Sequence, residues 1–265
     1  MSFSFDYQGK NVFIFGGTSG INLGIAKRFA ETGARVAVAS RSQDKVDAAV
    51  QELKALGSDA LGYSLDVRDV DAVKAAINAF HETAGPIDVL VSGAAGNFPA
   101  PALGMSANAF KTVVEIDLLG TFHVLQSAFH ALRQPGASII NISAPQSFLP
   151  MPFQSHVCAA KAGVDMVTKT LAMEWGMAGI RVNSIVPGPI AGTEGMERLA
   201  PTAKAKEACK KSVPLGRMGE AREIGDAALF LASDAAAYIS GVILPVDGGW
   251  ALGGASAAMM QAMQG

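Results

Sequence analysis

Short runs of β-branched and other apolar residues alternate along this chain with longer segments of helical pattern, and this alternation restricts its fold more than any other feature. Neighbouring parallel strands need a long crossover between them, which is usually a helix. The alternation therefore predicts an α/β fold with a doubly wound parallel sheet of about seven strands, flanked by helices on both faces. The predicted strands are 11–15, 35–40, 60–65, 89–92, 138–142, 181–186 and 242–245.

The helical segments between these strands fit one large domain. Half of the 265 residues are hydrophobic and 17% are charged, so residues 1–265 can bury a single sizeable core. The least regular stretch, 187–213, follows a strand and is rich in Gly, Pro, Ala and Lys, which makes it the predicted substrate lid. The predicted helices are 23–32, 45–56, 70–83, 107–133, 159–175 and 223–232.

Charge and cysteine usage exclude several classes of function. A formal net charge of −2 provides no broad attraction to nucleic acid or to an anionic membrane. The two cysteines, Cys158 and Cys209, form neither a disulfide framework nor a zinc-ligand spacing, so we expect no metal. The N-terminus has no apolar signal core and no run reaches transmembrane length. The sequence therefore predicts a cytoplasmic protein that binds neither nucleic acid nor membrane.

A glycine-rich segment follows the first predicted strand and leads directly into the first predicted helix. Glycine permits a tight turn and a close approach of the backbone to a pyrophosphate, and the helix N-terminus offers N–H donors. This context predicts a Rossmann-type dinucleotide site, although a glycine-rich turn without a ligand is the alternative. The residues that we expect to contact the cofactor here are Gly16, Thr18, Ser19, Gly20 and Ile21.

The second and third strands end in residues that bear on which dinucleotide is bound. The second ends at Ser40 and Arg41, where NAD-binding proteins usually carry an acidic residue against the ribose 2′-hydroxyl. Because a cation suits a 2′-phosphate, we expect NADP(H), with a solvated surface arginine as the alternative. Asp66 ends the third strand and is predicted either to accept from the adenine amine or to cap the helix that begins near Val70.

Taken together, the motifs resemble those of the short-chain dehydrogenase/reductase family over nearly the whole length. Its usual catalytic pattern is broken, because the tyrosine four residues before Lys161 falls on Val157 and the serine thirteen residues before that falls on Ala144. Asn22 replaces the third glycine of the loop. Neither valine nor alanine can polarise a carbonyl. The resemblance is carried by Gly16, Gly20, Asp66, Val67, Ala94, Ala95, Gly96, Asn141, Ile142, Ser143, Lys161, Arg181, Val182, Asn183, Pro187, Gly188, Asp247, Gly248 and Gly249.

A subgroup without the tyrosine is more similar still. The segments 94–98, 108–113, 116–117, 174–176 and 187–195 resemble the 2,4-dienoyl-CoA reductases, above all the peroxisomal type. The resemblance implies reduction of a conjugated C=C in an acyl-CoA-like thioester with NADPH. It also implies a homotetramer, with the long helices 107–133 and 159–175 at one interface.

Two residues are expected from the resemblance to carry the chemistry. Lys161 keeps the family position that binds the nicotinamide ribose, and Asp117 stands where the wider family has asparagine and is implied to help proton transfer. A structural partnership between Asp117 and Lys161 is the alternative. His156, Gln154 and Ser143 surround the missing tyrosine and are further candidates for hydrogen bonds to the thioester oxygen, whereas a core role is the alternative for His156.

The resemblance also implies binding positions outside the glycine-rich loop. The segment after the sixth strand would wrap the nicotinamide, with an ordinary Pro-Gly turn as the alternative. The cofactor positions are Asp66, Val67, Ala94, Ala95, Gly96, Lys161, Pro187, Gly188, Ile190 and Thr193. The CoA positions are Arg41, Arg68, Phe98, Ser106, Ala107, Asn108 and Arg198, the arginines alternatively being surface residues. The Met-rich residues 251–265 are expected to cover an apolar pocket, to pack on another subunit or to be loosely ordered.

Three functions fit these observations. The first is an NADPH-dependent reductase of a 2,4-dienoyl thioester. The second is a reductase of another conjugated or cyclic carbonyl compound on the same scaffold. The third is a catalytically silent nucleotide-binding sensor or partner subunit, which the missing tyrosine and serine favour and which the retained Lys161 and Asp117 oppose.

Overall fold

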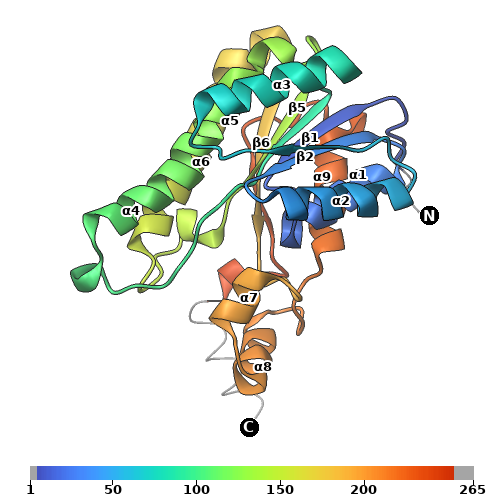
Figure 1. Cartoon of the computed structure of the whole chain (residues 1–265). Coiled ribbons are helices and arrows are strands. Elements are labelled where there is room, and N and C mark those ends of the chain that lie inside the picture. Colours follow the sequence, from blue (N-terminus) through green and yellow to red (C-terminus); the bar gives the residue numbers. More distant parts are fainter. Residues whose placement is uncertain (1–4, 254–265) are drawn as a thin grey trace.

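A computed structural model describes residues 5–253 and contains one seven-stranded parallel sheet (Figure 1). The strand order is β3-β2-β1-β4-β5-β6-β7, so the chain reverses its winding between β1 and β4. This is the predicted Rossmann-type fold, and the switch point is where such sheets bind their ligands. The strands are β1 (Asn11–Phe15), β2 (Arg35–Ser40), β3 (Leu61–Ser64), β4 (Val89–Ser92), β5 (Ser138–Ile142), β6 (Arg181–Pro187) and β7 (Ile243–Val246).

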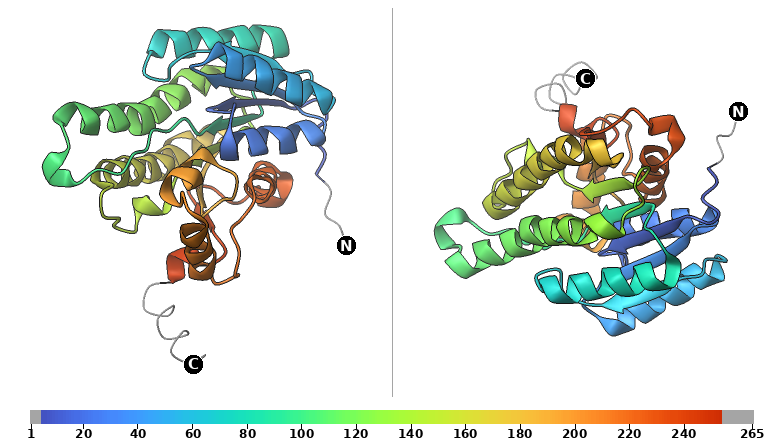
Figure 2. Two further views of the ribbon diagram at one scale, coloured as in Figure 1. Left: turned by 60° about the horizontal axis from the view of Figure 1, so that its bottom comes forward. Right: turned by 90° about the horizontal axis from the view of Figure 1, so that it is seen from above.

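Helices cover both faces of the sheet (Figure 2). The α-helices are α1 (Gly20–Glu31), α2 (Gln43–Ala55), α3 (Val70–Ala84), α4 (Ala107–Val114), α5 (Gly120–Ala128), α6 (Ser155–Trp175), α7 (Glu194–Leu199), α8 (Ala203–Ser212) and α9 (Ala221–Ala232). Short turns of 3-10 helix lie at Ala102–Gly104, Phe129–Ala131, Pro145–Ser147, Gly176–Ala178, Asp234–Ala236 and Trp250–Leu252.

The side-chain alternation of β1 explains why the sheet is buried on both sides. Val12 and Ile14 pack toward α1, α2 and α9, whereas Phe13 and Phe15 pack toward α3, α5 and α6. Successive side chains of a strand point to opposite faces, so a strand between two helical layers must be apolar throughout. All five residues of β1 are buried.

The predicted helix 107–133 is present, but its helical period changes in the middle and it ends two residues early. A π-helical turn, Glu115–Leu119, separates α4 from α5, and the last turn ends at Ala131. The wider turn brings Asp117 into the interior, where 1% of its surface is exposed. Turns of this kind occur often at functional sites, and they leave no mark on the hydrophobic period of a sequence.

The segment 187–213 is more regular than its composition predicts. It contains α7 and α8, which project below the sheet in Figure 1. Thr193 and Thr202 accept hydrogen bonds from backbone N–H groups in the first turns of these helices, and such caps offset the Gly- and Pro-rich surroundings. Within residues 5–253, no helix is long and apolar enough to cross a membrane. The Met-rich tail from residue 254 onward lies outside the described residues.

Candidate active site

Two adjoining cavities of about 420 and 570 Å³ open at the carboxyl ends of β1 and β4. They form one continuous cleft, because Ser19, Asn22, Ala95 and Arg198 line both. One part runs over the ends of β2 and β3, and we refer to it as the adenosine side. The other extends to β5, β6 and α6, and we refer to it as the reaction side. A cleft of this shape and position suits an extended dinucleotide with a second ligand beside its far end.

The turn between β1 and α1 requires glycine at two of its positions. Gly16 has a φ of +79°, and a Cβ there would lie 2.8 Å from the backbone nitrogen of Ala94. Gly20 has a φ of +54°. Positive φ angles and a close backbone approach both require glycine. The bare turn at the start of α1 therefore fits a pyrophosphate.

Asn22, which replaces the third glycine of the loop, has a structural contact that sequence reasoning missed. It is buried, and its Nδ2 donates to the carbonyl oxygen of Gly93 at 2.7 Å. A Cβ on Gly93 would lie 2.4 Å from this side chain. The asparagine thus joins the start of α1 to the residue that follows β4, and its extra bulk is accommodated because that residue is glycine.

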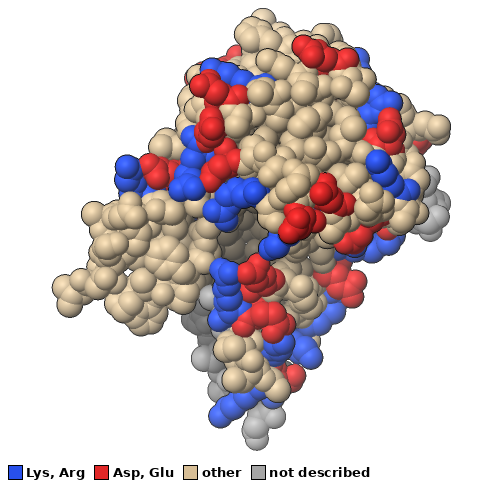
Figure 3. Space-filling model, in the orientation of Figure 1, with Lys and Arg blue, Asp and Glu red and all other residues tan. Residues whose placement is uncertain are grey.

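The adenosine side has two cations with no carboxylate partner. Arg41 and Lys45 line it with Ser40 and Ser42, and within residues 5–253 no carboxylate lies within 4.0 Å of either cation. Thr18 donates through its hydroxyl to Ser40 at 2.9 Å. Lys and Arg side chains flank the hollow near the centre of the face in Figure 3. This end of the cleft fits an additional phosphate on the ribose, and Lys45 was not predicted.

The alternative role of Asp66 as a helix cap is wrong. Asp69 caps α3 through hydrogen bonds from the N–H groups of Asp71 and Ala72. Asp66 instead accepts several hydrogen bonds from Arg68, which lower the pKa of its carboxyl group, with burial opposing them. Arg68 lines a separate surface hollow on the far side of Asp66, so the structure does not bring it into the main cleft.

Asp117 and Lys161 meet on the reaction side, and both are buried. Lys161 Nζ lies 3.5 Å from Asp117 Oδ2 and donates to the carbonyl oxygen of Ile142 at 2.9 Å. The other carboxylate oxygen of Asp117 accepts from the N–H of Gly96 at 2.7 Å. Burial raises the pKa of Asp117, while Lys161 and the Gly96 N–H oppose the shift. A carboxyl group held closer to its protonated form can donate a proton.

An apolar wall stands where the wider family places its tyrosine and serine. Val157 and Ala144 line the reaction side beside Ser143. His156 does not line this cavity, and its fully buried ring packs 4.5 Å from the ring of Phe98. Neither ring nitrogen of His156 has a hydrogen-bond partner within the described chain. Gln146 also lines the cavity, and it was not among the predicted residues.

Most of the predicted site residues converge on the cleft. Those lining it are Gly16, Thr18, Ser19, Gly20, Ile21, Ser40, Arg41, Asp66, Val67, Ala94, Ala95, Gly96, Asp117, Lys161, Pro187, Gly188, Thr193 and Arg198. Ile190 instead faces a cavity of about 500 Å³ between α9 and β7. Phe98 and Ser106, Ala107 and Asn108 also lie outside the lining, the last three at the start of α4, where Ser106 caps the helix. Within residues 5–253, no group of acidic, His and Cys side chains is placed to hold a metal.

The chain matches known oxidoreductases over most of its length. Residues 16–251 match the family described as enoyl-(acyl carrier protein) reductase. The peroxisomal 2,4-dienoyl-CoA reductase [(3E)-enoyl-CoA-producing] of Rattus norvegicus is 45% identical over 244 residues, covering 91% of this chain and 84% of that protein. The probable 2,4-dienoyl-CoA reductase [(2E)-enoyl-CoA-producing] of Bacillus subtilis is 40% identical over 247 residues, covering 91% of this chain and 96% of that protein.

Solved structures show the same fold. A short chain dehydrogenase from Bacillus anthracis is 40% identical, with a TM-score of 0.84, and the match covers 91% of this chain and 96% of that one. A variant of actinorhodin polyketide ketoreductase, solved with NADPH, is 29% identical, with a TM-score of 0.87, over 91% of this chain and 97% of that one.

Proposed function

We propose that this chain, which belongs to the short-chain dehydrogenase/reductase family, uses NADPH to reduce a conjugated C=C of an acyl thioester, specifically a 2,4-dienoyl-CoA. The observation that carries the proposal is the buried Asp117–Lys161 pair beside an apolar wall of Val157 and Ala144. Such a site lacks the hydroxyl acid needed for alcohol and ketone interconversion, but it keeps a lysine and a carboxyl group for another proton transfer. The names of the relatives support the same substrate class.

The choice of NADPH rests on the adenosine side of the cleft. The family binds nicotinamide dinucleotides, and the cations Arg41 and Lys45, which pair with no carboxylate of the described residues, favour a 2′-phosphate over a free 2′-hydroxyl. Asp66 accepts from the adenine amine in this proposal, and the glycine-rich turn receives the pyrophosphate. Pro187 and Gly188 hold the nicotinamide end, and Thr193 lies near the pyrophosphate.

The chain's own residues position the reactants and handle charge and protons. NADPH, when bound, supplies a hydride at the far alkene carbon of the diene. Lys161 binds the nicotinamide ribose, and its cation favours the negative charge that develops on the thioester oxygen. Asp117, whose raised pKa favours the acid form, supplies a proton toward the carbon next to the thioester. The burial of Asp117 limits competing proton exchange between its carboxyl group and bulk water.

The CoA portion leaves the reaction side past Arg198, which lines both parts of the cleft. Arg198 donates to Glu194 and to the backbone oxygen of Asn97, so a CoA phosphate must compete with these contacts. The segment 187–213, with α7 and α8, acts as the lid. In this proposal the cleft must close around the substrate before CoA contacts Phe98, Arg68 and Ser106 to Asn108.

We further propose a cytoplasmic homotetramer. The outward faces of α5 and α6 expose Phe122, Met166 and Met173, and a second copy of the chain would cover this apolar area. Both cysteines are free, which suits a reducing compartment. Sedimentation velocity measures the oligomer, and cell fractionation distinguishes a cytoplasmic from a peroxisomal location.

The first experiment follows NADPH oxidation by the purified protein with a 2,4-dienoyl-CoA, a 2-enoyl-CoA and a simple ketone. Selective turnover of the dienoyl-CoA is the expected result. Turnover of a conjugated ketone in preference to every thioester would replace the proposal with a reductase of other conjugated carbonyls. Tight NADPH binding without any turnover would support a non-catalytic role instead.

A further inference from the structure

The reaction side of the cleft contains a side-chain amide that the proposed chemistry has not yet used. Gln146 lies on the 3-10 turn Pro145–Ser147, directly after β5, and only 9% of its surface is exposed. It lines the same cavity as Asp117, Lys161 and Ala144. The turn thus places a polar group next to the wall that has lost its serine.

A second glutamine holds this amide in place. Gln146 Nε2 donates to Gln154 Oε1 at 2.6 Å, and Gln154 is buried at the start of α6. The backbone oxygen of Gln154 accepts from the N–H of Cys158, so the first turn of α6 fixes the backbone from which the Gln154 side chain extends. Two long side chains lose conformational freedom to make this single contact. The pair therefore rigidly positions the Gln146 amide.

The hydrogen-bonding capacity of Gln146 is only partly used. A carboxamide has two N–H donors and one carbonyl acceptor, and the contact to Gln154 uses one donor. The Gln146 Oε1 atom is buried and has no hydrogen-bond partner among residues 5–253. The Oε1 atom can be satisfied only by a donor, whereas the second N–H of the amide, which also has no hydrogen-bond partner among residues 5–253, is the group that can meet an acceptor in the cavity.

We propose that Gln146 donates a hydrogen bond to the thioester oxygen of the substrate and that Gln154 is its positioning residue. The inference rests on the proposed reduction of a dienoyl thioester. A thioester oxygen only accepts hydrogen bonds, so of the two free groups of the Gln146 amide it selects the N–H. The side chains of Val157 and Ala144 cannot donate a hydrogen bond, and Gln146 supplies on the same wall what the serine and tyrosine supply elsewhere in the family.

The electron balance of the reaction gives this hydrogen bond a catalytic effect. When hydride bonds to the far alkene carbon, the electron pairs of the two double bonds shift and charge collects on the thioester oxygen. A proton then bonds to the carbon next to the thioester, which returns the electron pair and restores the carbonyl. The Gln146 N–H stabilises the charged stage more than the neutral substrate, and it therefore accelerates the reaction.

The test compares Gln146→Leu with the native chain and with Ser147→Ala. Ser147 is a matched control, because it lies on the same turn and its Oγ is also buried without a partner among the described residues, but it does not line the cavity. Turnover of a 2,4-dienoyl-CoA should fall about 10²-fold in Gln146→Leu, mostly in kcat. Ser147→Ala should stay within twofold of the native rate, and the Kd for NADPH should not change in either variant.

A spectroscopic measurement separates polarisation of the carbonyl from a structural effect. The absorption band of a dienoyl-CoA shifts to longer wavelength when its carbonyl is hydrogen-bonded, and we expect this shift in the complex with oxidised cofactor. Gln146→Leu should abolish the shift, and Gln154→Leu should reduce it. If Gln146→Leu does not fold, Gln146→Asn withdraws the amide from Gln154 while keeping its polarity.

The outcomes distinguish the two proposals. Suppose that the native chain reduces dienoyl-CoA and that Gln146→Leu either keeps a rate within twofold of native or leaves the absorption shift unchanged. The proposed role of Gln146 is then overturned, and the proposed reductase activity stands. A native chain that reduces no dienoyl-CoA overturns both.

Discussion

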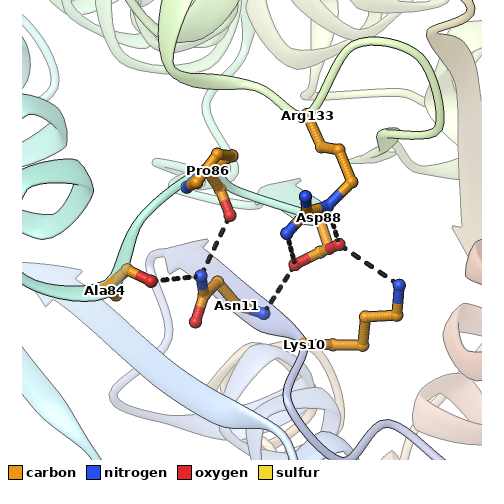
Figure 4. A network of polar contacts seen from close by, with 6 residues as sticks. All are labelled: Lys10, Asn11, Ala84, Pro86, Asp88 and Arg133. Carbon is orange, nitrogen blue, oxygen red and sulfur yellow. Dashed lines mark hydrogen bonds and ion pairs between the residues drawn. The ribbon is translucent and has the colours of Figure 1, made fainter.

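Two buried aspartates at opposite edges of the sheet have opposite surroundings. Asp88 lies directly before β4, at the amino edge, and Figure 4 shows how its contacts converge. Its carboxylate accepts from the backbone N–H of Asn11 at 2.9 Å, from Lys10 at 3.4 Å and from Arg133 at 2.5 Å and 3.3 Å. Asn11 continues the network by donating through its side chain to two backbone oxygens. Both carboxylate oxygens of Asp88 are satisfied within the chain.

Asp117, at the carboxyl edge, is left incomplete. One of its oxygens accepts from Gly96, and the other faces Lys161 at 3.5 Å without a hydrogen bond within the described residues. Ser143 Oγ and Gln146 Oε1, on the wall of the same cavity, are also buried without partners in this part of the chain. A satisfied network stabilises a fold, whereas unsatisfied polar groups around a cavity indicate a binding or reaction site.

Replacing Asp117 should cost the most activity. Asp117→Asn keeps the shape of the side chain but cannot supply a proton, so turnover should fall about 10²–10⁴-fold. The rate of dienoyl-CoA reduction measures the loss, and the Kd for NADPH is the control for an intact cofactor site. Native-like turnover by this variant would remove Asp117 from the chemistry.

Replacing Asp88 should affect stability instead. Asp88→Ala leaves the buried N–H of Asn11 without an acceptor and separates Arg133 and Lys10 from their anion, so we expect a loss of about 3 kcal/mol in the free energy of unfolding. Chemical denaturation measures it. The kcat of the folded fraction should match the native value. A large drop in kcat would contradict the assignment of Asp88 to stability and of Asp117 to catalysis.

The arginines give a second comparison between paired and unpaired cations. Arg41 has no carboxylate partner among residues 5–253 and lines the cleft, whereas Arg133 is paired with Asp88 far from it. Arg41→Ala should lower the preference for NADPH over NADH about tenfold, because a charged hydrogen bond to the 2′-phosphate is lost. Arg133→Ala is the matched control, and it should leave the ratio of the two KM values unchanged. Equal effects of the two variants would contradict the assignment.

The smallest expected effect is a pH dependence of stability. Burial raises the pKa of Asp117 above its unfolded value near 3.8, against the opposing effect of Lys161. The folded chain therefore holds this proton more tightly, so the stabilising contribution is complete below the unfolded pKa and is lost as the pH rises through the folded pKa. The Tm of the native chain should fall relative to that of Asp117→Asn as the pH rises above the unfolded pKa near 3.8. A constant difference would show that the pKa is not raised.

Local pattern was sufficient to predict the framework and much of the cleft. The strand and helix periodicities predicted the parallel sheet, and a strand followed directly by glycines and a helix predicted the loop at Gly16 and Gly20. Lys161 and Asp117 were predicted from resemblance alone, and the structure places them together. Their catalytic roles stay predictions.

The sequence by itself determined the layers of this protein, because the side-chain periods of strands and helices are local properties. Only the tertiary structure decided which polar groups are satisfied. The Asp66–Arg68 contact and the Gln146–Gln154 pair depend on side-chain conformations that a residue pattern does not specify. The π-helical turn at Asp117 depends on a local change of helical period, and the packing of His156 against Phe98 joins residues distant in sequence. The hydrophobic pattern of a chain does not encode such contacts, and in this cleft they separate the groups that support the fold from those left free to react.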